Sequence, residues 1–281
     1  MESEMTEDRK ITKKERTEQP DGEVKQVVDF ALEAGRILLK NGGEIFRVEE
    51  TITRICQHFG VEHVDIFTLS HGIFVSAENE KGEVYTRVKH IPLSGSHLGI
   101  VAEVNELSRQ IAGGKVTILE AQERLVQIDR IPPSRARTQV LGAGMGAACF
   151  GYLMGASLAE SVVTFFIGCL VYLWVILAKR CRLSKIIINI AGGIMITLCA
   201  IFATRLSTAS MVFSLDGMII GAIMPLIPGM AFTNAIRDIA DSDFLSGTVR
   251  MMDALMVFVY IAVGVGIVLM TYNNMTGGFI L

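Results

Sequence analysis

The chain has 281 residues, of which 51% are hydrophobic and 20% are charged, and its formal net charge is -3. A composition this apolar is typical of membrane proteins. The negative charge balance and the absence of a nucleic-acid motif argue against a nucleic-acid partner. The five cysteines form no CxxC pair, so the sequence predicts no disulfide framework.

Polar and apolar residues are sharply divided near Arg137. Residues 1–21 mix acidic, basic and polar side chains without an apolar core, so we interpret them as a disordered tail rather than a signal peptide or a spanning helix. We interpret residues 22–131 as a cytoplasmic α+β domain, residues 132–139 as a linker and residues 140–281 as a transmembrane domain. The expected fold class is an integral membrane α-helical bundle with an N-terminal cytoplasmic α+β domain.

The α+β domain shows a change of hydrophobic period along the chain. Apolar residues recur at helical spacing in two segments that Asn41-Gly42-Gly43 separates. Three β-branched and aromatic runs then predict an antiparallel meander, and two more helices close the domain, the second opened by a capping box of Thr117 and Glu120. The first two expected helices cover residues 24–39 and 44–59. The expected strands cover residues 61–69, 72–77 and 83–91.

The corner between the first two helices carries both glycines and charges. One interpretation is a regulatory or substrate-entry contact. The other is a helix corner with ion pairs between residues three apart. The residues concerned are Gly42, Gly43, Glu44, Arg47 and Glu50.

Five apolar runs in the second half are each long enough to cross about 30 Å of hydrocarbon. They cover residues 140–158, 159–178, 186–204, 211–232 and 254–272. Lys and Arg gather on the connections that share a side with the N-terminal domain. We therefore expect a multi-pass protein of the cell (plasma) membrane, with the N-terminal domain cytoplasmic and the C-terminus outside. Glycines four residues apart in the first run, such as Gly142 and Gly146, predict close helix packing.

Residues 225–253 hold six of the ten Asp, Glu, Lys and Arg side chains of the last hundred positions. Pro225, Pro228 and Gly229 predict a helix break, which a spanning segment tolerates only beside protein or a water-lined cavity. An ordinary kink near the cytoplasmic boundary is the alternative. Upstream, Asp216 is favoured as the N-cap of a helix that starts at Gly217, with an intramembrane carboxylate as the other possibility.

Two polar helix faces follow the expected break and form our candidate substrate-binding site. Arginines would pair with a substrate carboxylate, Thr233 and Asn234 would bond its polar groups, and Asp238 or Asp241 would bind an ammonium group or a coupling proton. A solvated amphipathic linker with surface ion pairs would show the same spacing. The candidate residues are Thr233, Asn234, Arg237, Asp238, Asp241, Ser246, Arg250 and Asp253.

Three segments carry a family resemblance: NGGEIFRVEETITRIC, IMPLIPGMAFTNAIRD and DSDFLSGTVRMMDAL. Together they resemble the threonine/serine exporter (ThrE) family, in particular its N-terminal half, a form also found as a separate YjjP-type subunit. The resemblance covers residues 23–275. Its motif positions correspond to Pro228, Gly229, Thr233, Asn234, Arg237, Asp238, Gly247 and Arg250.

The resemblance implies a half-transporter with a cytoplasmic domain and five spans. Such proteins export small polar metabolites, which are threonine and serine in fused members and a dicarboxylate such as succinate in the split form. Fused members carry further spans beyond the fifth. The resemblance therefore also implies a secondary transporter completed by a small multi-span membrane partner subunit, or by a homo-oligomer, in the lipid bilayer.

Other function classes receive less support from the sequence. The five histidines fall within residues 58–97, but their spacing matches no standard zinc-ligand set, so no metal and no cofactor is expected. No P-loop, dinucleotide fingerprint or hydrolase motif is found, so we do not expect an enzyme. The rival hypotheses are a membrane-anchored, hydrolase-like enzyme and a sensor, each acting through the cytoplasmic domain.

Overall fold

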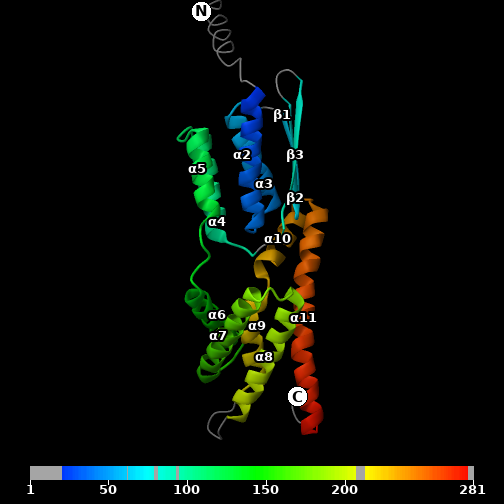
Figure 1. Cartoon of the computed structure of the whole chain (residues 1–281). Coiled ribbons are helices and arrows are strands. Elements are labelled where there is room, and N and C mark those ends of the chain that lie inside the picture. Colours follow the sequence, from blue (N-terminus) through cyan, green and yellow to red (C-terminus); the bar gives the residue numbers. More distant parts are fainter. Residues whose placement is uncertain (1–20, 62, 79–81, 93–94, 207–212, 278–281) are drawn as a thin grey trace, which may run out of the picture. The chain divides into compact units, whose positions relative to one another are not determined.

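The computed structural model describes residues 21–61, 63–78, 82–92, 95–206 and 213–277 (Figure 1). The described residues form two compact units. The first unit contains the chain up to Pro132 together with Thr233–Val249, and the second contains Pro133–Phe232 and the chain from Arg250 onward. The predicted disordered tail lies outside the described residues, apart from Asp21 at the start of the first helix.

The N-terminal part of the first unit is an α+β domain, as predicted. Its sheet is an antiparallel meander in the order β1-β2-β3, with His63 opposite Glu78 and Gly72 opposite His90. The predicted order of helices and strands is confirmed, and only the ends of the elements differ. The elements are α2 (Asp21–Lys40), α3 (Ile45–His58), β1 (His63–Leu69), β2 (Gly72–Glu78), β3 (Val84–His90), α4 (Leu98–Ala112) and α5 (Ile118–Asp129).

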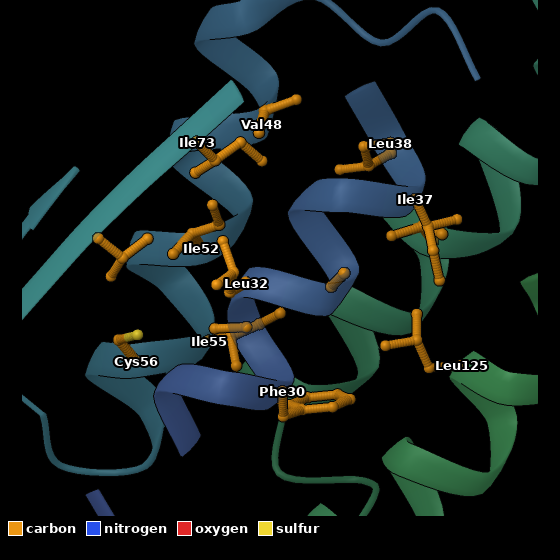
Figure 2. Packing of buried hydrophobic residues seen from close by; sticks show 14 of the residues in the cluster. Phe30, Leu32, Ile37, Leu38, Val48, Ile52, Ile55, Cys56, Ile73 and Leu125 are labelled. Atoms are coloured by element: carbon orange, nitrogen blue, oxygen red, sulfur yellow. The ribbon is translucent and has the colours of Figure 1, made fainter. Parts of the chain in front are cut away.

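One apolar core holds this domain together (Figure 2). Ile37 and Leu38 of α2 pack with Val48 and Ile52 of α3, and Ile73 of β2 closes the cluster; all five are fully buried. Residues of β2 alternate between this core and the opposite face of the sheet, which is the period-2 pattern that favoured a strand. Burying each such side chain stabilises the fold by about 1.5–3 kcal/mol.

Helix α5 begins as the sequence predicts. The backbone N–H of Thr117 donates to Glu120 Oε2 at 2.9 Å, and the N–H of Glu120 donates to Thr117 Oγ1 at 3.4 Å. Both orphan donors at the helix start are satisfied, so the capping box is confirmed.

The second unit is built from apolar helices. They are α6 (Ala136–Leu153), α7 (Leu158–Arg180), α8 (Lys185–Arg205), α9 (Leu215–Ile223), the 3-10 helix η1 (Met224–Leu226) and most of α11 (Phe244–Thr276). Within the described residues α7, α8 and α11 are long and apolar enough to cross a membrane. Helix α9 with η1 and α10 (Gly229–Ala240) would add a fourth span if the bent pair counts as one. Helix α6 is not among these candidates, so the count of five spans stays a prediction.

The apolar helix α9 does not continue into α10. It ends at Ile223, η1 carries Pro225, and α10 starts at Gly229, with a bend of 67° between the two helices. Proline has no N–H and its ring clashes with the preceding turn, so two prolines close together interrupt the hydrogen-bond ladder. Residues 216–236 therefore do not form one continuous helix.

The predicted N-cap at Asp216 is wrong. Ser214 caps α9, because its Oγ accepts a hydrogen bond from the N–H of Gly217 at 3.5 Å. Asp216 lies in the first turn, where a carboxylate is favoured by the positive end of the helix dipole. Ser and Asp are both good caps, and spacing alone did not choose between them.

Glu160 is a buried carboxylate that the sequence reading missed. It accepts hydrogen bonds from the backbone N–H groups of Ser157 and Ser214, so it joins the start of α7 to the start of α9. The signal was available, because Ser157 and Glu160 have the spacing of a capping box.

Glycines allow close packing in the second unit, and of the two predicted pairs, Gly142 with Gly146 and Gly151 with Gly155, only Gly151 takes part, since a Cβ at Gly221 would lie 2.8 Å from Gly151 Cα. A Cβ at Gly142 or Gly146 would meet no described atom within 4 Å, whereas one at Gly144 would lie 2.4 Å from Cys169 Sγ. Helices α8 and α11 meet at Gly264, where a Cβ would lie 2.2 Å from the carbonyl oxygen of Ile190.

The contact at Gly264 predicts a pair of opposite effects on stability. Gly264→Ala should lower the thermal unfolding midpoint of the detergent-solubilised chain, because forcing a methyl group against backbone costs about 1–3 kcal/mol. Gly266→Ala, on the same helix with nothing within 4 Å, should leave the midpoint unchanged or raise it, since alanine is the better helix former. Equal midpoints for the two variants would contradict the α8–α11 packing.

Candidate functional site

The polar stretch divides between the two compact units. Residues Thr233–Val249 belong to the first unit and Arg250 onward to the second. Six of the eight predicted substrate-binding residues therefore lie in the unit of the N-terminal domain. Only Arg250 and Asp253 lie in the unit of apolar helices.

Helix α10 has one exposed and one buried polar face. Thr233, Arg237 and Asp241, at the start, middle and end of one face, are exposed. Asn234 and Asp238, on the adjoining face, are buried. The sequence predicted both faces from their spacing, but the spacing did not tell which of them packs inward.

Residues of both faces of α10 contact the helix corner after α2. Asn234 Nδ2 donates to the carbonyl oxygen of Gly42 at 2.9 Å. One turn later, Arg237 Nη1 donates to Glu44 Oε1 and forms an ion pair with it. The corner also holds the expected ion pair between Glu44 and Arg47, with Arg47 Nε 3.1 Å from Glu44 Oε2. The ion pair of the second interpretation is confirmed, and the regulatory or substrate-entry role of the first stays a prediction.

A tight turn connects α10 to α11. Ser242 adopts a left-handed conformation with φ of 71°, and the N–H of Ser246 donates to Asp243 Oδ1 at 3.2 Å. Asp243 thus makes the capping bond at the start of α11. Gly247 allows a close approach to α10, since a Cβ there would lie 2.6 Å from Ile239 Cγ1.

Two buried polar side chains lie one turn apart on α11. Ser246 is 1% exposed, and its Oγ has no hydrogen-bond partner among the described residues. Arg250 is 6% exposed. Buried polar groups in proteins are usually hydrogen-bonded. A charged arginine within an apolar spanning helix costs free energy, and such residues commonly mark functional sites.

Asp253 lies one turn further along α11 and forms an ion pair with Lys185. Lys185 Nζ lies 2.6 Å from Asp253 Oδ2, at the start of α8. Both side chains are about half exposed, so the pair is accessible. No local signal links two residues 68 positions apart.

Glu49 of α3 is a second carboxylate near the α10–α11 turn. Its Oε1 accepts a hydrogen bond from the N–H of Thr68 at 2.9 Å. Burial raises the pKa of Glu49 above its ordinary value, and the neighbouring negative charge of Asp243 adds to the increase in pKa. The bond from Thr68 opposes the shift in this pKa.

Two hollows lie away from the predicted substrate residues. A groove of about 700 Å³ lies between α2 and α5, with Phe30 and Leu125 among its lining residues. A smaller hollow of about 380 Å³ in the second unit is lined by apolar residues, including Phe258 and Val265. None of the eight predicted residues lines either one. Among the residues that the structure describes, no group of three His, Cys, Asp or Glu side chains is placed to hold a metal ion.

The comparisons with known proteins bear on this arrangement. The sequence model of the family described as "Putative threonine/serine exporter" (ThrE) matches residues 29–272. The chain belongs to the ThrE family. The resemblance predicted from the three segments is thereby confirmed, and the protein is a member of a membrane transporter family.

Two relatives of this ThrE-family chain carry the name "Probable succinate transporter subunit YjjP". The protein from Klebsiella aerogenes is 24% identical over 251 residues, which cover 86% of this chain and 93% of the relative. The protein from Escherichia coli K12 is 24% identical over 245 residues, covering 85% and 92% of the two chains. No solved structure matches this chain.

The raised pKa of Glu49 predicts a specific pH dependence of stability. A carboxyl group with a raised folded-state pKa contributes stability below its ordinary pKa of 4.5, and that contribution is lost as pH rises through the folded value. Glu49→Gln should therefore gain in unfolding midpoint relative to wild type as the pH is raised from 4 to 8, with the gain beginning above the ordinary value.

The control for this measurement is Glu106→Gln, which removes an exposed carboxylate of α4 at the same change in net charge. The pKa of Glu106 is lowered, chiefly by its hydrogen bonds to Gln110 and Arg109. Its midpoint difference from wild type should not rise over that window. A parallel rise in both variants would show that net charge, and not Glu49, sets the effect.

Proposed function

We propose that this chain is a subunit of a secondary exporter that moves small carboxylates out of the cell. A dicarboxylate such as succinate is the leading substrate, and amino acids of the threonine and serine type are the alternative. The observation that carries the proposal is the burial of Arg250 on α11, a 33-residue apolar helix, one turn after Ser246, whose hydroxyl has no hydrogen-bond partner among the described residues. A fixed cation in such surroundings is a carboxylate-binding group by its chemistry.

The proposed roles follow from side-chain chemistry. Arg250 binds one substrate carboxylate and Ser246 bonds the same end of the molecule. Arg237, exposed on α10, is a second arginine that binds carboxylate, and the names of the relatives favour a dicarboxylate over an amino acid. Thr233 and Asn234 bond further polar groups, and Asp238, Asp241 or Asp253 takes a coupling proton or an ammonium group.

The break before α10 supports transport rather than anchoring. Secondary transporters place substrate at interrupted helices, because freed backbone groups and helix ends supply polar contacts inside the bilayer. Pro225, Pro228 and Gly229 lie at such an interruption here. Movement of α10 about the break is the step we propose for alternating access.

The assembly and orientation are part of the same proposal. The relatives are named as subunits, and this chain matches 93% and 92% of their lengths, which supports a separate multi-span partner or a homo-oligomer. The bias of Lys and Arg supports a cytoplasmic N-terminal domain and an external C-terminus. Five spans in this chain fit that orientation.

Efflux from cells tests the proposal. Cells that produce this chain with its chromosomal neighbour should release succinate faster than cells with the neighbour alone, and Arg250→Gln should reduce that release at least tenfold. Loss of a charged partner for a bound carboxylate is worth about 2–5 kcal/mol, which is more than the tenfold change requires.

Matched controls decide what the result means. Arg180→Gln removes an exposed arginine from the last turn of α7 and should leave efflux unchanged. Both variants should reach the membrane in equal amounts on immunoblots. Normal efflux from Arg250→Gln would overturn the assigned role, and release of threonine or serine in place of succinate would establish the amino-acid alternative.

A further inference from the structure

The corner after α2 is held in one conformation by its own contacts. Gly42 adopts φ of +88°, and a Cβ there would lie 2.7 Å from Ser96 Oγ, so only glycine fits. Asn41 Nδ2 donates to the carbonyl oxygen of Ile37 at 2.8 Å, and the N–H of His97 donates to the carbonyl oxygen of Asn41 at 3.0 Å. The corner therefore presents the Gly42 carbonyl and the Glu44 carboxylate from a fixed backbone.

Two polar contacts hold helix α10 to this corner through predicted substrate residues. They are the bond from Asn234 to Gly42 and the ion pair between Arg237 and Glu44, three residues apart on α10. Chain interruptions bound the helix on both sides, at Gly229 and at the left-handed Ser242. A segment between two such points moves as a unit when its contacts are released.

Glu44 is shared between two arginines. Its Oε1 accepts from Arg237 and its Oε2 lies 3.1 Å from Arg47 Nε on its own helix. If Arg237 leaves, Glu44 keeps Arg47 as a counter-charge, so separation does not strand a carboxylate. The Arg237 side chain is 49% exposed, which leaves it accessible to a solute.

We propose that Glu44 is a positioning residue that competes with the exported carboxylate for Arg237. The proposal rests on the proposed function, in which Arg237 binds substrate. A substrate carboxylate replaces the chemically equivalent carboxylate of Glu44, Glu44 turns to Arg47, and α10 loses its ion pair with the corner while the bond from Asn234 to Gly42 remains. Carboxylate binding thereby weakens the attachment of α10 to the corner, and a solute without a carboxylate leaves the ion pair in place.

The strength of the pair suits such a switch. Ion pairs with this exposure contribute little to stability, so a solute at millimolar concentration competes with them. A buried pair would resist exchange, because breaking it leaves an uncompensated charge in a low dielectric.

The test uses the full chain with its partner subunit in membrane vesicles and measures KM and kcat for succinate transport. Glu44→Gln removes the competitor, so KM should fall about two- to fivefold, the range expected for an exposed pair. Arg237→Gln removes the site, so KM should rise at least tenfold. Two halves of a merely structural ion pair would shift KM in the same direction, and that result would overturn the inference.

Arg47 gives a second, independent readout. Arg47→Gln removes the alternative partner of Glu44, so Glu44 holds Arg237 more tightly and KM should rise about two- to fivefold. In the Glu44→Gln background the same substitution should have no effect on KM, because the competitor is already gone. A persistent Arg47 effect in that background would also overturn the inference.

The control is Glu106→Gln, which removes the acid of another Glu–Arg pair three residues apart, on α4, and should leave KM unchanged. Where a variant transports succinate too slowly for KM to be measured, the binding of succinate to the purified full chain provides the same comparison. Absence of transport of succinate, threonine and serine by the wild-type chain would refute the proposed function itself. Transport by wild type with parallel KM shifts in Glu44→Gln and Arg237→Gln would refute only the competition.

Discussion

The arrangement of the polar residues depends on one backbone constraint, the interruption of the helix between Ile223 and Gly229. Two prolines within four residues remove hydrogen-bond donors from an apolar helix, so it cannot run on through the polar sequence that follows. The amphipathic helix α10 instead belongs, from Thr233 onward, to the unit of the N-terminal domain, where its buried face meets the corner at Gly42. Burying Asn234 against a backbone carbonyl satisfies a group that hydrocarbon would leave unpaired.

Local signals carried most of the fold prediction. The change from helical to strand period, the glycines at the corner and the capping box at Thr117 each act within a few residues, and the α+β domain follows from them. The predictions that were wrong or stayed open involve competition between similar signals. Ser214 and Asp216, two positions apart, are both residue types that favour an N-cap, and Ser214 is the one that caps α9. The first turn of α6 contains Arg137 and Gln139, which lower its mean hydropathy below that of α7 and α8.

The candidate site could be read from the sequence only in part. Spacing placed Thr233, Arg237 and Asp241 on one face and Asn234 and Asp238 on the next, and family resemblance singled out both the corner and α10. Neither could pair them, because Arg237 and Glu44 are 193 positions apart and a long-range contact leaves no periodic trace. The same holds for Lys185 with Asp253. Chemistry indicated which side chains were unusual, and only the fold showed what they touch.

The two arginines differ in burial, and this difference assigns them different tasks under the proposed function. Arg250 is buried, so a carboxylate that reaches it gains a strong, weakly screened interaction and is held. Arg237 is half exposed and pairs with Glu44, so exchange of this partner changes the free energy little but changes what α10 is attached to. A transporter needs both, since a site that only binds tightly does not release. Placing the weak, exchangeable pair on the segment between the break and the turn lets occupancy control movement without a large loss of stability.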